Sequence, residues 1–301
     1  MPREFYSHGK LLLSGEYAIL DGALGLAIPT KFGQSLKFTP SPYNLLDWKS
    51  FDSDGQPWFE AKLELPKFKI SSTTDQETAD RLLEILATAK TLNNSFLESG
   101  GGLVETNLTF PRNWGLGTSS TVVNNLANWA EVDPYLLLQK TFGGSGYDIA
   151  CAQHSSPITY QLQNGQPKVQ KVDFDPPYKE KLFFVYLNQK RNSREAISNY
   201  RSLQFEKSLL VEKLSALTTK MIKCSTLDEF DSLLDEHEEL LSKVLGIPPV
   251  KSKLFSDYSG ATKSLGAWGG DFILATGSQK HQAYFKEKGY STILPYTELA
   301  L

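Results

Sequence analysis

One stretch of the sequence carries the residue types that bind phosphate groups. It reads Pro111-Arg-Asn-Trp-Gly-Leu-Gly-Thr-Ser-Ser-Thr121, with two glycines followed by hydroxyl side chains. Glycine permits backbone conformations in which successive N–H groups point to one centre, and such a nest attracts anions. A helix that starts directly after the loop adds the positive end of its dipole. The stretch therefore predicts a phosphate-binding loop; a plain turn with a Ser or Thr helix cap is the alternative.

A carboxylate follows a second glycine-containing turn. The segment Gly144-Ser-Gly-Tyr-Asp-Ile-Ala150 places Asp148 shortly after two glycines. By itself this carboxylate is compatible with a cap of the short helix that we expect to follow it.

Two further stretches combine a lysine with glycines. The first is Ser7-His-Gly-Lys10, followed by Gly15–Glu16, and the second is Gly260-Ala-Thr-Lys-Ser-Leu-Gly-Ala-Trp-Gly-Gly-Asp271. Each by itself is also compatible with a solvated turn or a flexible hairpin loop. Neither is a Walker A loop, because no G-x-x-x-x-G-K-[ST] occurs, and the glycine spacing does not fit a dinucleotide-binding fingerprint.

The elements around the first stretch would aim it at one point. Val104, Thr106, Leu108 and Phe110 alternate with polar residues as in a half-buried strand, and apolar residues over 122–130 follow helical spacing. The predicted order is strand, glycine-rich loop, helix. This order directs the loop N–H groups and the helix N-terminus to the same place.

Elsewhere the patterns predict a mixture of strands and helices. Near the N-terminus we expect short strands at Phe5–Tyr6 and Lys10–Leu13, interrupted at Ser7–Gly9, and strands over Gly22–Phe38 broken at Pro29. A capping box at Thr74–Glu77 predicts a helix start. The remaining expected elements are loops with short strands over 40–60, a helix over Pro134–Lys140, a hairpin around Asn164–Gly165, an apolar strand Leu182–Leu187, two or three helices over roughly 193–245, a strand Phe272–Ala275, and a helix and strand after His281. The last of the helices over 193–245 is expected to start at Thr226–Glu229 and to end at Gly246 and Pro248.

Composition is that of an ordinary globular enzyme. The chain has 301 residues, of which 40% are hydrophobic and 22% charged, with a formal net charge of −3. We expect no nucleic-acid or membrane partner, because the chain has no basic excess and no apolar run of membrane-spanning length. The start lacks the apolar core of a signal peptide, and Cys151 and Cys224 show no metal-binding spacing. We therefore expect a cytoplasmic protein with reduced thiols.

Together, and in this order, the stretches resemble the GHMP kinase superfamily of galactokinase, homoserine kinase, mevalonate kinase and phosphomevalonate kinase. His8–Lys10 with Gly15–Glu16 is similar to the first family motif, the loop from Pro111 to Ser119 to the second, and Lys263 with Gly266–Gly270 to the third. Gly146–Ala150 reads GYDIA, the sequence after which one subgroup is named. The resemblance extends from Ser7 to about Gly277.

The resemblance implies an α+β fold in two domains. The N-terminal domain, 1–175, is expected to resemble ribosomal protein S5 domain 2, and the C-terminal domain, 176–301, to be ferredoxin-like. The boundary falls in the proline-containing stretch Asp175–Tyr178. ATP and the phosphate acceptor would meet in the cleft between the domains.

The resemblance also implies roles for individual residues. Asp148 and Lys10 are the expected catalytic residues, and Ser119 the expected Mg²⁺ ligand. The expected ATP-binding residues are Pro111, Gly115, Leu116, Gly117, Thr118, Ser119 and Ser120. The expected substrate-site residues are Glu16, Lys190, Arg191, Arg194, Lys263, Gly266, Ala267, Gly269 and Gly270.

Some positions depart from the family pattern. His8 stands where the family usually has Pro, Tyr17 where mevalonate kinases usually have His, and Trp268 at a usual Gly position. Gln139 and Lys140 occupy the region in which mevalonate kinases carry a magnesium-binding Glu. Metal binding would then depend on Ser119 and water.

The acceptor is expected to be a small anionic molecule, with mevalonate and phosphomevalonate favoured. Lys190, Arg191 and Arg194 follow a predicted buried strand and could hold its phosphate or carboxylate, although a solvated basic loop is equally compatible. Two other functions stay open: an ATP-dependent lyase of the diphosphomevalonate decarboxylase type, and a non-catalytic binding protein with this fold. Oligomeric state is not encoded in any visible pattern, and a homodimer is one option.

Overall fold

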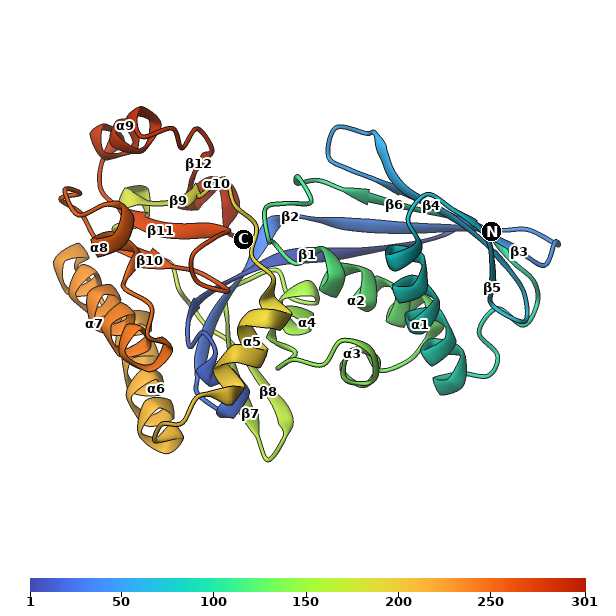
Figure 1. Cartoon of the computed structure of the whole chain (residues 1–301), viewed down its shortest axis with the longest axis horizontal. Coiled ribbons are helices and arrows are strands. Elements are labelled where there is room, and N and C mark those ends of the chain that lie inside the picture. The colour runs from blue at the N-terminus through green and yellow to red at the C-terminus, as the bar shows by residue number, and fades with distance from the viewer. The chain divides into compact units, whose positions relative to one another are not determined.

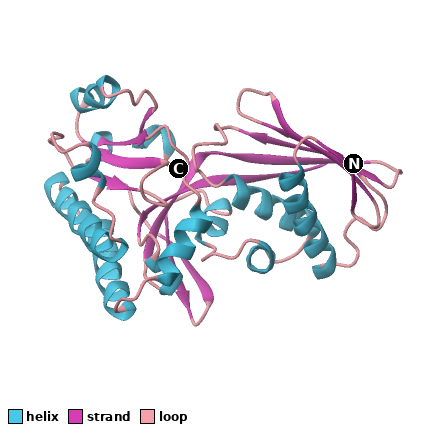
Figure 2. Ribbon diagram, in the orientation of Figure 1, coloured by secondary structure: helices cyan, strands magenta, loops and turns pink.

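The computed structural model describes all 301 residues, which form a mixed α+β protein (Figures 1 and 2). The strands are β1 (Arg3–Ser14), β2 (Gly25–Pro40), β3 (Leu45–Phe51), β4 (Pro57–Glu64), β5 (Lys69–Thr73), β6 (Gly102–Leu108), β7 (Ile158–Gln163), β8 (Gln166–Lys171), β9 (Leu182–Tyr186), β10 (Thr262–Ser264), β11 (Phe272–Thr276) and β12 (Ile293–Pro295). The α-helices are α1 (Gln76–Leu92), α2 (Thr118–Ala130), α3 (Pro134–Thr141), α4 (Tyr147–Ala152), α5 (Ser193–Ser202), α6 (Lys207–Lys223), α7 (Leu227–Leu245), α8 (Val250–Leu254), α9 (Gln279–Glu287) and α10 (Tyr296–Leu299). Two short 3₁₀ helices are η1 (Ala18–Asp21) and η2 (Lys179–Lys181).

The chain divides into two compact units made of interleaved segments. Unit 1 contains Met1–Gly9, Phe32–Arg112 and Leu116–Gln153, and unit 2 contains Lys10–Lys31, Asn113–Gly115 and His154–Leu301. The strands β1 and β2 each supply residues to both units. The predicted boundary between residues 175 and 176 divides the chain into two continuous segments instead, and it stays a prediction.

Unit 1 consists of a sheet with helices packed against it (Figure 1). Its strands follow the order β5-β4-β3-β6-β2, and only the β3–β6 pair among them is parallel. Apolar side chains from the sheet, such as Trp48 and Phe59, form one core with Leu86 of α1 and Leu126 of α2. This core fixes α2, and therefore the end of the glycine-rich loop that precedes it.

Unit 2 contains a four-stranded sheet in the order β10-β11-β9-β12, together with the β2–β7–β8 strands. The four strands are antiparallel, and β9 and β11 are fully buried. Phe183 and Ile273 from these strands pack with Phe255 and Phe285 in one core. The long helices α6 and α7 lie side by side (Figure 1).

The predicted order of strand, loop and helix around residues 102–130 is confirmed by β6 and α2. The hairpin around Asn164–Gly165 is also confirmed, with Gln163 paired to Gln166. At α7 the Thr226 side chain accepts a hydrogen bond from the Glu229 N–H, and Gly246 ends the helix in a left-handed conformation. Local capping and turn chemistry therefore located these boundaries.

Three local predictions are wrong. Ser7–Gly9 does not interrupt the first strand, since β1 is continuous over Arg3–Ser14. Pro29 does not break β2, because proline accepts an extended backbone and its carbonyl still takes a hydrogen bond from the Leu301 N–H at 3.1 Å. The cap of α1 is Asp75 rather than Thr74, and its carboxylate accepts from the Thr78 N–H at 2.7 Å.

Candidate active site

The second half of the glycine-rich loop leads into α2 within unit 1. Gly117 has a φ of 97°, in the left-handed region, and is the N-cap of the helix. Ser119 is exposed on the first turn, whereas the buried Ser120 donates its hydroxyl hydrogen to the Gly117 carbonyl at 2.9 Å. The first-turn N–H groups and the Ser119 hydroxyl are therefore the groups of this segment that a phosphate could approach.

Buried polar side chains of α2 form hydrogen bonds with residues of β1 and β2. The Ser7 hydroxyl donates to Asn125 at 2.7 Å and accepts from Asn124 at 2.9 Å. Asn125 in turn donates to the Gln34 carbonyl, and the Thr121 hydroxyl donates to the Gln34 side chain at 2.7 Å. These bonds connect α2 to β1 and β2 and fix the helix that carries the loop. The only local sign of these bonds is the pair of adjacent asparagines in a helical apolar pattern.

Asp148 lies on the first turn of α4, which packs against α2 in unit 1. The N-cap of α4 is Gly146, with a φ of 85°, so the alternative in which Asp148 is the helix cap is wrong. The half-buried Asp148 carboxylate accepts a hydrogen bond from the Ile149 N–H at 3.1 Å. The turn therefore presents a carboxylate on a short helix beside the helix that follows the loop.

The first half of the loop contacts Lys10 within unit 2. The Lys10 Nζ donates to the Gly115 carbonyl at 2.9 Å. Gly115 has a φ of 71°, which is unfavourable for residues with a side chain. Pro111, the first residue of the loop, is half-buried, and Leu116 is completely buried. The predicted phosphate loop and the predicted catalytic lysine are thus directly connected.

The third glycine-rich stretch forms the loop between β10 and β11. Gly266 and Gly269 have positive φ values of 65° and 88°, and Ala267 and Trp268 are buried. The Arg191 side chain lies along this loop, with its Nε donating to the Gly269 carbonyl at 3.1 Å. A Cβ at Gly270 would lie 2.5 Å from the Arg191 Cγ. The glycines at 269 and 270 therefore make room for an arginine.

The other basic residues of the predicted acceptor site are exposed. Lys190 lies next to Arg191 in the segment that follows β9, and Arg194 is on the first turn of α5. The α5 cap is Asn192, whose side chain accepts from the Arg194 N–H at 3.1 Å. Their contact with an acceptor stays a prediction.

Two predicted substrate-site residues, Glu16 and Lys263, are instead paired with each other in the interior of unit 2. Their side chains are 1% and 0% exposed, and the Lys263 Nζ donates to a Glu16 carboxylate oxygen. Burial raises the pKa of Glu16, and the charge of Lys263 opposes that rise. Their charged groups thus face one another rather than solvent, which favours an indirect role; a direct contact with substrate stays a prediction.

Two residues of α7 complete this buried network, which we define as Glu16, His237, Glu238 and Lys263. His237 accepts the Gly15 N–H at its Nε2 at 3.0 Å, so the 3.2 Å approach of Glu16 to the same nitrogen is not an ion pair. Burial lowers the pKa of His237 well below its usual value, which keeps the ring neutral. Glu238 accepts from the Ser264 N–H at 2.9 Å, and burial raises the pKa of Glu238 to about 7.

His237 is completely buried on α7 and makes a polar contact that a helical spacing of apolar residues does not indicate. Glu238 was missed because nothing in the acidic run around it distinguishes one buried carboxylate from its exposed neighbours. The network connects the first motif, α7 and the strand β10, which carries Lys263 of the third motif.

Tyr17, at the unusual position of the first motif, stacks on Tyr200, with ring centroids 5.3 Å apart. The Tyr200 hydroxyl donates to Asp21 at 2.6 Å. Tyr17 is largely buried, and burial raises its pKa to about 12, so its hydroxyl group stays protonated at neutral pH.

No group of three or more His, Cys, Asp or Glu side chains is placed to hold a metal ion. A magnesium site based on Ser119 stays a prediction, and the exposed hydroxyl is of a suitable ligand type. None of the helices combines the length and apolar composition of a membrane span.

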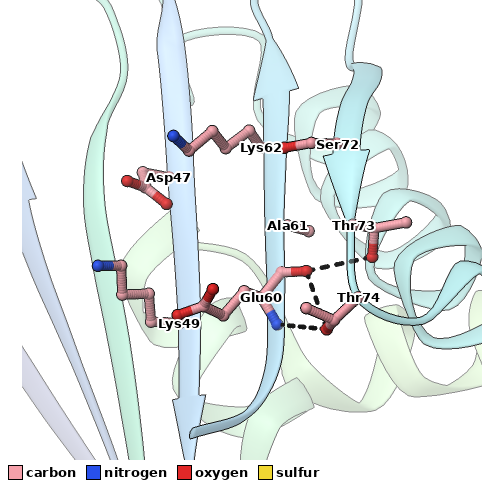
Figure 3. Close-up of a pocket in the computed structure, with 8 residues that line it drawn as sticks. All are labelled: Asp47, Lys49, Glu60, Ala61, Lys62, Ser72, Thr73 and Thr74. Atoms are coloured by element: carbon pink, nitrogen blue, oxygen red, sulfur yellow. Dashed lines mark hydrogen bonds between the residues drawn. The ribbon is translucent and has the colours of Figure 1, made fainter.

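A pocket lies on the sheet of unit 1, and none of the predicted site residues lines it (Figure 3). It is lined by charged and hydroxyl side chains of β3, β4 and β5 and of the segment after β5: Asp47, Lys49, Glu60, Ala61, Lys62, Ser72, Thr73 and Thr74. The Thr73 and Thr74 hydroxyls bond to the Glu60 backbone. Acidic and basic side chains are mixed in its lining, which gives no single charge that would select a ligand. The pocket is therefore not part of the candidate site.

Solved structures share the fold of this chain. The Lin0012 protein of Listeria innocua matches with a TM-score of 0.72 at 16% identity, over 98% of this chain and 97% of that one. Methanococcus jannaschii mevalonate kinase matches with a TM-score of 0.69 at 15% identity, over 98% and 97%. Streptococcus pneumoniae phosphomevalonate kinase, in complex with phosphomevalonate and AMPPNP, matches with a TM-score of 0.70 at 15% identity, over 97% and 99%. No protein-family model and no curated protein sequence matches.

These likenesses cover nearly the whole chain and show the fold. The predicted α+β fold of the two-domain GHMP kinase type is confirmed, and the resemblance inferred from the motifs fits it. The subgroup named after the GYDIA sequence and the individual site residues stay predictions.

Proposed function

We propose that this chain, which has the fold of the GHMP kinases, is an ATP-dependent kinase of a small anionic metabolite. The observation that carries the proposal is the hydrogen bond from Lys10 to Gly115, because it puts a cation on the loop whose residue types suit phosphate binding. The sequence motifs and the fold agree independently with this function. Mevalonate and phosphomevalonate are the favoured acceptors.

In this proposal the loop and the first turn of α2 bind the ATP phosphates through backbone N–H groups. Lys10 stabilises the negative charge that develops during transfer, and Asp148 orients the acceptor hydroxyl or accepts its proton. Mg²⁺ bound with ATP would neutralise phosphate charge, with Ser119 and water as ligands. Phosphoryl transfer needs positioning and charge neutralisation more than covalent help, which is what these residue types supply.

The acceptor's anionic group would lie against the exposed basic residues Lys190, Arg191 and Arg194. Support comes from Arg191, whose Nε is held by the Gly269 carbonyl while its guanidinium stays exposed. A guanidinium fixed in this way matches a carboxylate or phosphate group with little loss of side-chain entropy. Charge reversal at Arg191 and Arg194 should raise the KM for the acceptor and leave that for ATP nearly unchanged.

The proposed function is tested by ATP consumption with mevalonate, its phosphates, homoserine and simple sugars. Transfer of phosphate to one of them without carbon dioxide release supports a kinase. Carbon dioxide release coupled to ATP use would identify a lyase, and nucleotide binding without turnover of any acceptor would favour a binding protein.

The residue assignment is tested by Asp148→Asn, with Asp80→Asn as a control. Asp80 is an exposed carboxylate of α1, in the same unit, that accepts a hydrogen bond from Gln76. Loss of proton acceptance should lower kcat about 10²- to 10⁴-fold, or ~3–5 kcal/mol of barrier, without loss of ATP binding. Gly117→Val should instead weaken ATP binding in a folded protein. A fall in kcat below about tenfold in Asp148→Asn would show that this carboxylate is not the base.

A further inference from the structure

Asp271 ends the loop between β10 and β11 in a backbone conformation that few residues adopt. Its φ is 53°, in the left-handed region, although Asp and Asn tolerate this region better than other side chains. Its N–H donates to the Gln189 carbonyl at 2.6 Å, and its carbonyl accepts from the Leu187 N–H at 2.8 Å. Unfavourable conformations held by surrounding bonds are concentrated at functional sites.

The Asp271 carboxylate fills the space that a side chain at position 115 would occupy. A Cβ on Gly115 would lie 2.5 Å from the Asp271 Cγ and 2.7–2.8 Å from its oxygens. One of these oxygens also accepts from the Arg191 N–H at 3.3 Å. A negative charge therefore lies directly against the loop that we expect to bind phosphate.

Cations surround this carboxylate. The Lys10 ammonium donates to the carbonyl of Gly115, the residue against which the Asp271 carboxylate lies, and the Arg191 Nε donates to the carbonyl of Gly269, two residues before Asp271. Burial raises the pKa of Asp271, and the charges of Lys10, Lys190 and Arg191 oppose that rise. We define Lys10, Lys190 and Arg191 as the cation cluster, which all lies within unit 2.

We propose that Asp271 is the internal counter-ion of the cation cluster and sets the affinity of this cluster for phosphate groups. The inference rests on the proposed function, because Asp271 would regulate phosphate binding at the same loop. Three cations held close together repel one another in the absence of a ligand, and one carboxylate among them lowers that repulsion. The same carboxylate repels an incoming phosphate, so it limits how tightly substrate and product are held.

The test uses two variants of Asp271 whose new residues both tolerate the left-handed backbone conformation at this position. Asp271→Asn removes the charge, tolerates the left-handed conformation and keeps an amide oxygen for the Arg191 N–H. Asp271→Gly also fits this φ but removes the whole side chain. The control is Asp257→Asn, an exposed carboxylate of unit 2 that accepts from the Tyr284 hydroxyl at 2.5 Å and pairs with Lys288.

The probe is inorganic tripolyphosphate, with its affinity measured by calorimetry on the full chain. Asp271→Asn should bind it about three- to tenfold more tightly than the unsubstituted protein at low salt, because one repelling charge is gone. The difference should shrink at about 0.5 M salt, where exposed charges are screened. The KM for ATP should fall in the same variant, and Asp257→Asn should change neither quantity.

Unchanged or weaker tripolyphosphate binding in Asp271→Asn would overturn the proposal, as would absence of binding to the unsubstituted protein. If Asp271→Asn does not fold, Asp271→Gly decides by the same affinity measurement. Tighter tripolyphosphate binding without turnover of any acceptor would contradict the proposed kinase function while supporting the counter-ion role. Thus the two proposals fail by different results.

Discussion

The buried network and the cation cluster of unit 2 each take residues from the same two sequence motifs. The first motif supplies Glu16 to the network and Lys10 to the cluster, and the third supplies Lys263 to the network and Asp271 to the cluster's counter-charge. Both places thus combine a lysine with a carboxylate. They differ in burial, since Glu16 and Lys263 are 1% and 0% exposed, whereas Arg191 and Lys190 are exposed.

This difference separates a structural role from a ligand-binding role. Charges removed from water must be paired inside the protein, and loss of one partner leaves the other unpaired at high cost. Charges at the surface contribute little to stability but remain available to a ligand. We therefore expect substitutions in the network to change unfolding, and substitutions in the cluster to change kinetics.

The largest expected effect on stability belongs to Lys263→Met. The Glu16 carboxylate would lose its buried partner, which should cost about 3–5 kcal/mol of unfolding free energy. Urea unfolding measures this loss, and the double variant Glu16→Gln with Lys263→Met should recover part of it. Lys288→Met removes a lysine from a surface pair with Asp257 and should have a small effect. A loss below about 1 kcal/mol in Lys263→Met would show that the buried pair contributes no more to stability than a surface pair.

The next effect is a pH dependence from Glu238. Burial raises the pKa of this carboxyl to about 7 from an ordinary 4.5, so the folded protein keeps the proton at pH values where the unfolded chain has released it. The associated stability is fully present below pH 4.5 and is lost as the pH rises through 7. The difference amounts to about 3 kcal/mol. Glu238→Gln should flatten this part of the profile, and a profile identical to that of the unsubstituted protein would contradict the pKa assignment.

A comparable effect on the barrier, with little change in stability, is expected for Lys10→Met. Loss of the ammonium should lower kcat about 10²-fold, or ~2.7 kcal/mol, because developing charge on the transferred phosphate is no longer stabilised. Lys31→Met is a matched control, since Lys31 is an exposed lysine that also donates to a backbone carbonyl in unit 2, that of Thr297. Equal kcat values for the two variants would exclude a catalytic role of Lys10.

The smallest effect is expected for Arg191→Lys, which keeps the charge but loses the Nε bond to Gly269. A lysine cannot present a fixed planar fork, so the KM for the acceptor should rise about three- to tenfold while that for ATP changes less than about twofold. Arg201→Lys, on the exposed part of α5, supplies the control. An unchanged KM for the acceptor would show that Arg191 is a solvated surface residue that does not bind the acceptor.

The sequence by itself determined the order of the elements that carry the motifs, and it indicated the fold class through the family resemblance of those motifs. Glycines at 115 and 117, the alternation in β6 and the helical spacing after residue 121 identified the loop and α2, because turn, strand and helix patterns are local properties. Capping and turn residues likewise located the start of α7 and the β7–β8 hairpin.

Only the tertiary structure decided which charged residues are buried and which stay accessible. The continuity of β1 through Ser7–Gly9 and of β2 through Pro29 depends on pairing with distant strands, which local signals cannot report. The same holds for Glu238 and Asp271, whose partners lie 26 and 80 residues away in the chain. Asp271 had one local sign, a carboxylate directly after a glycine pair, but its contact with Gly115 arises because distant segments fold together. Burial and charge pairing both result from that packing. They determine which motif residues stabilise the fold and which can contact a ligand.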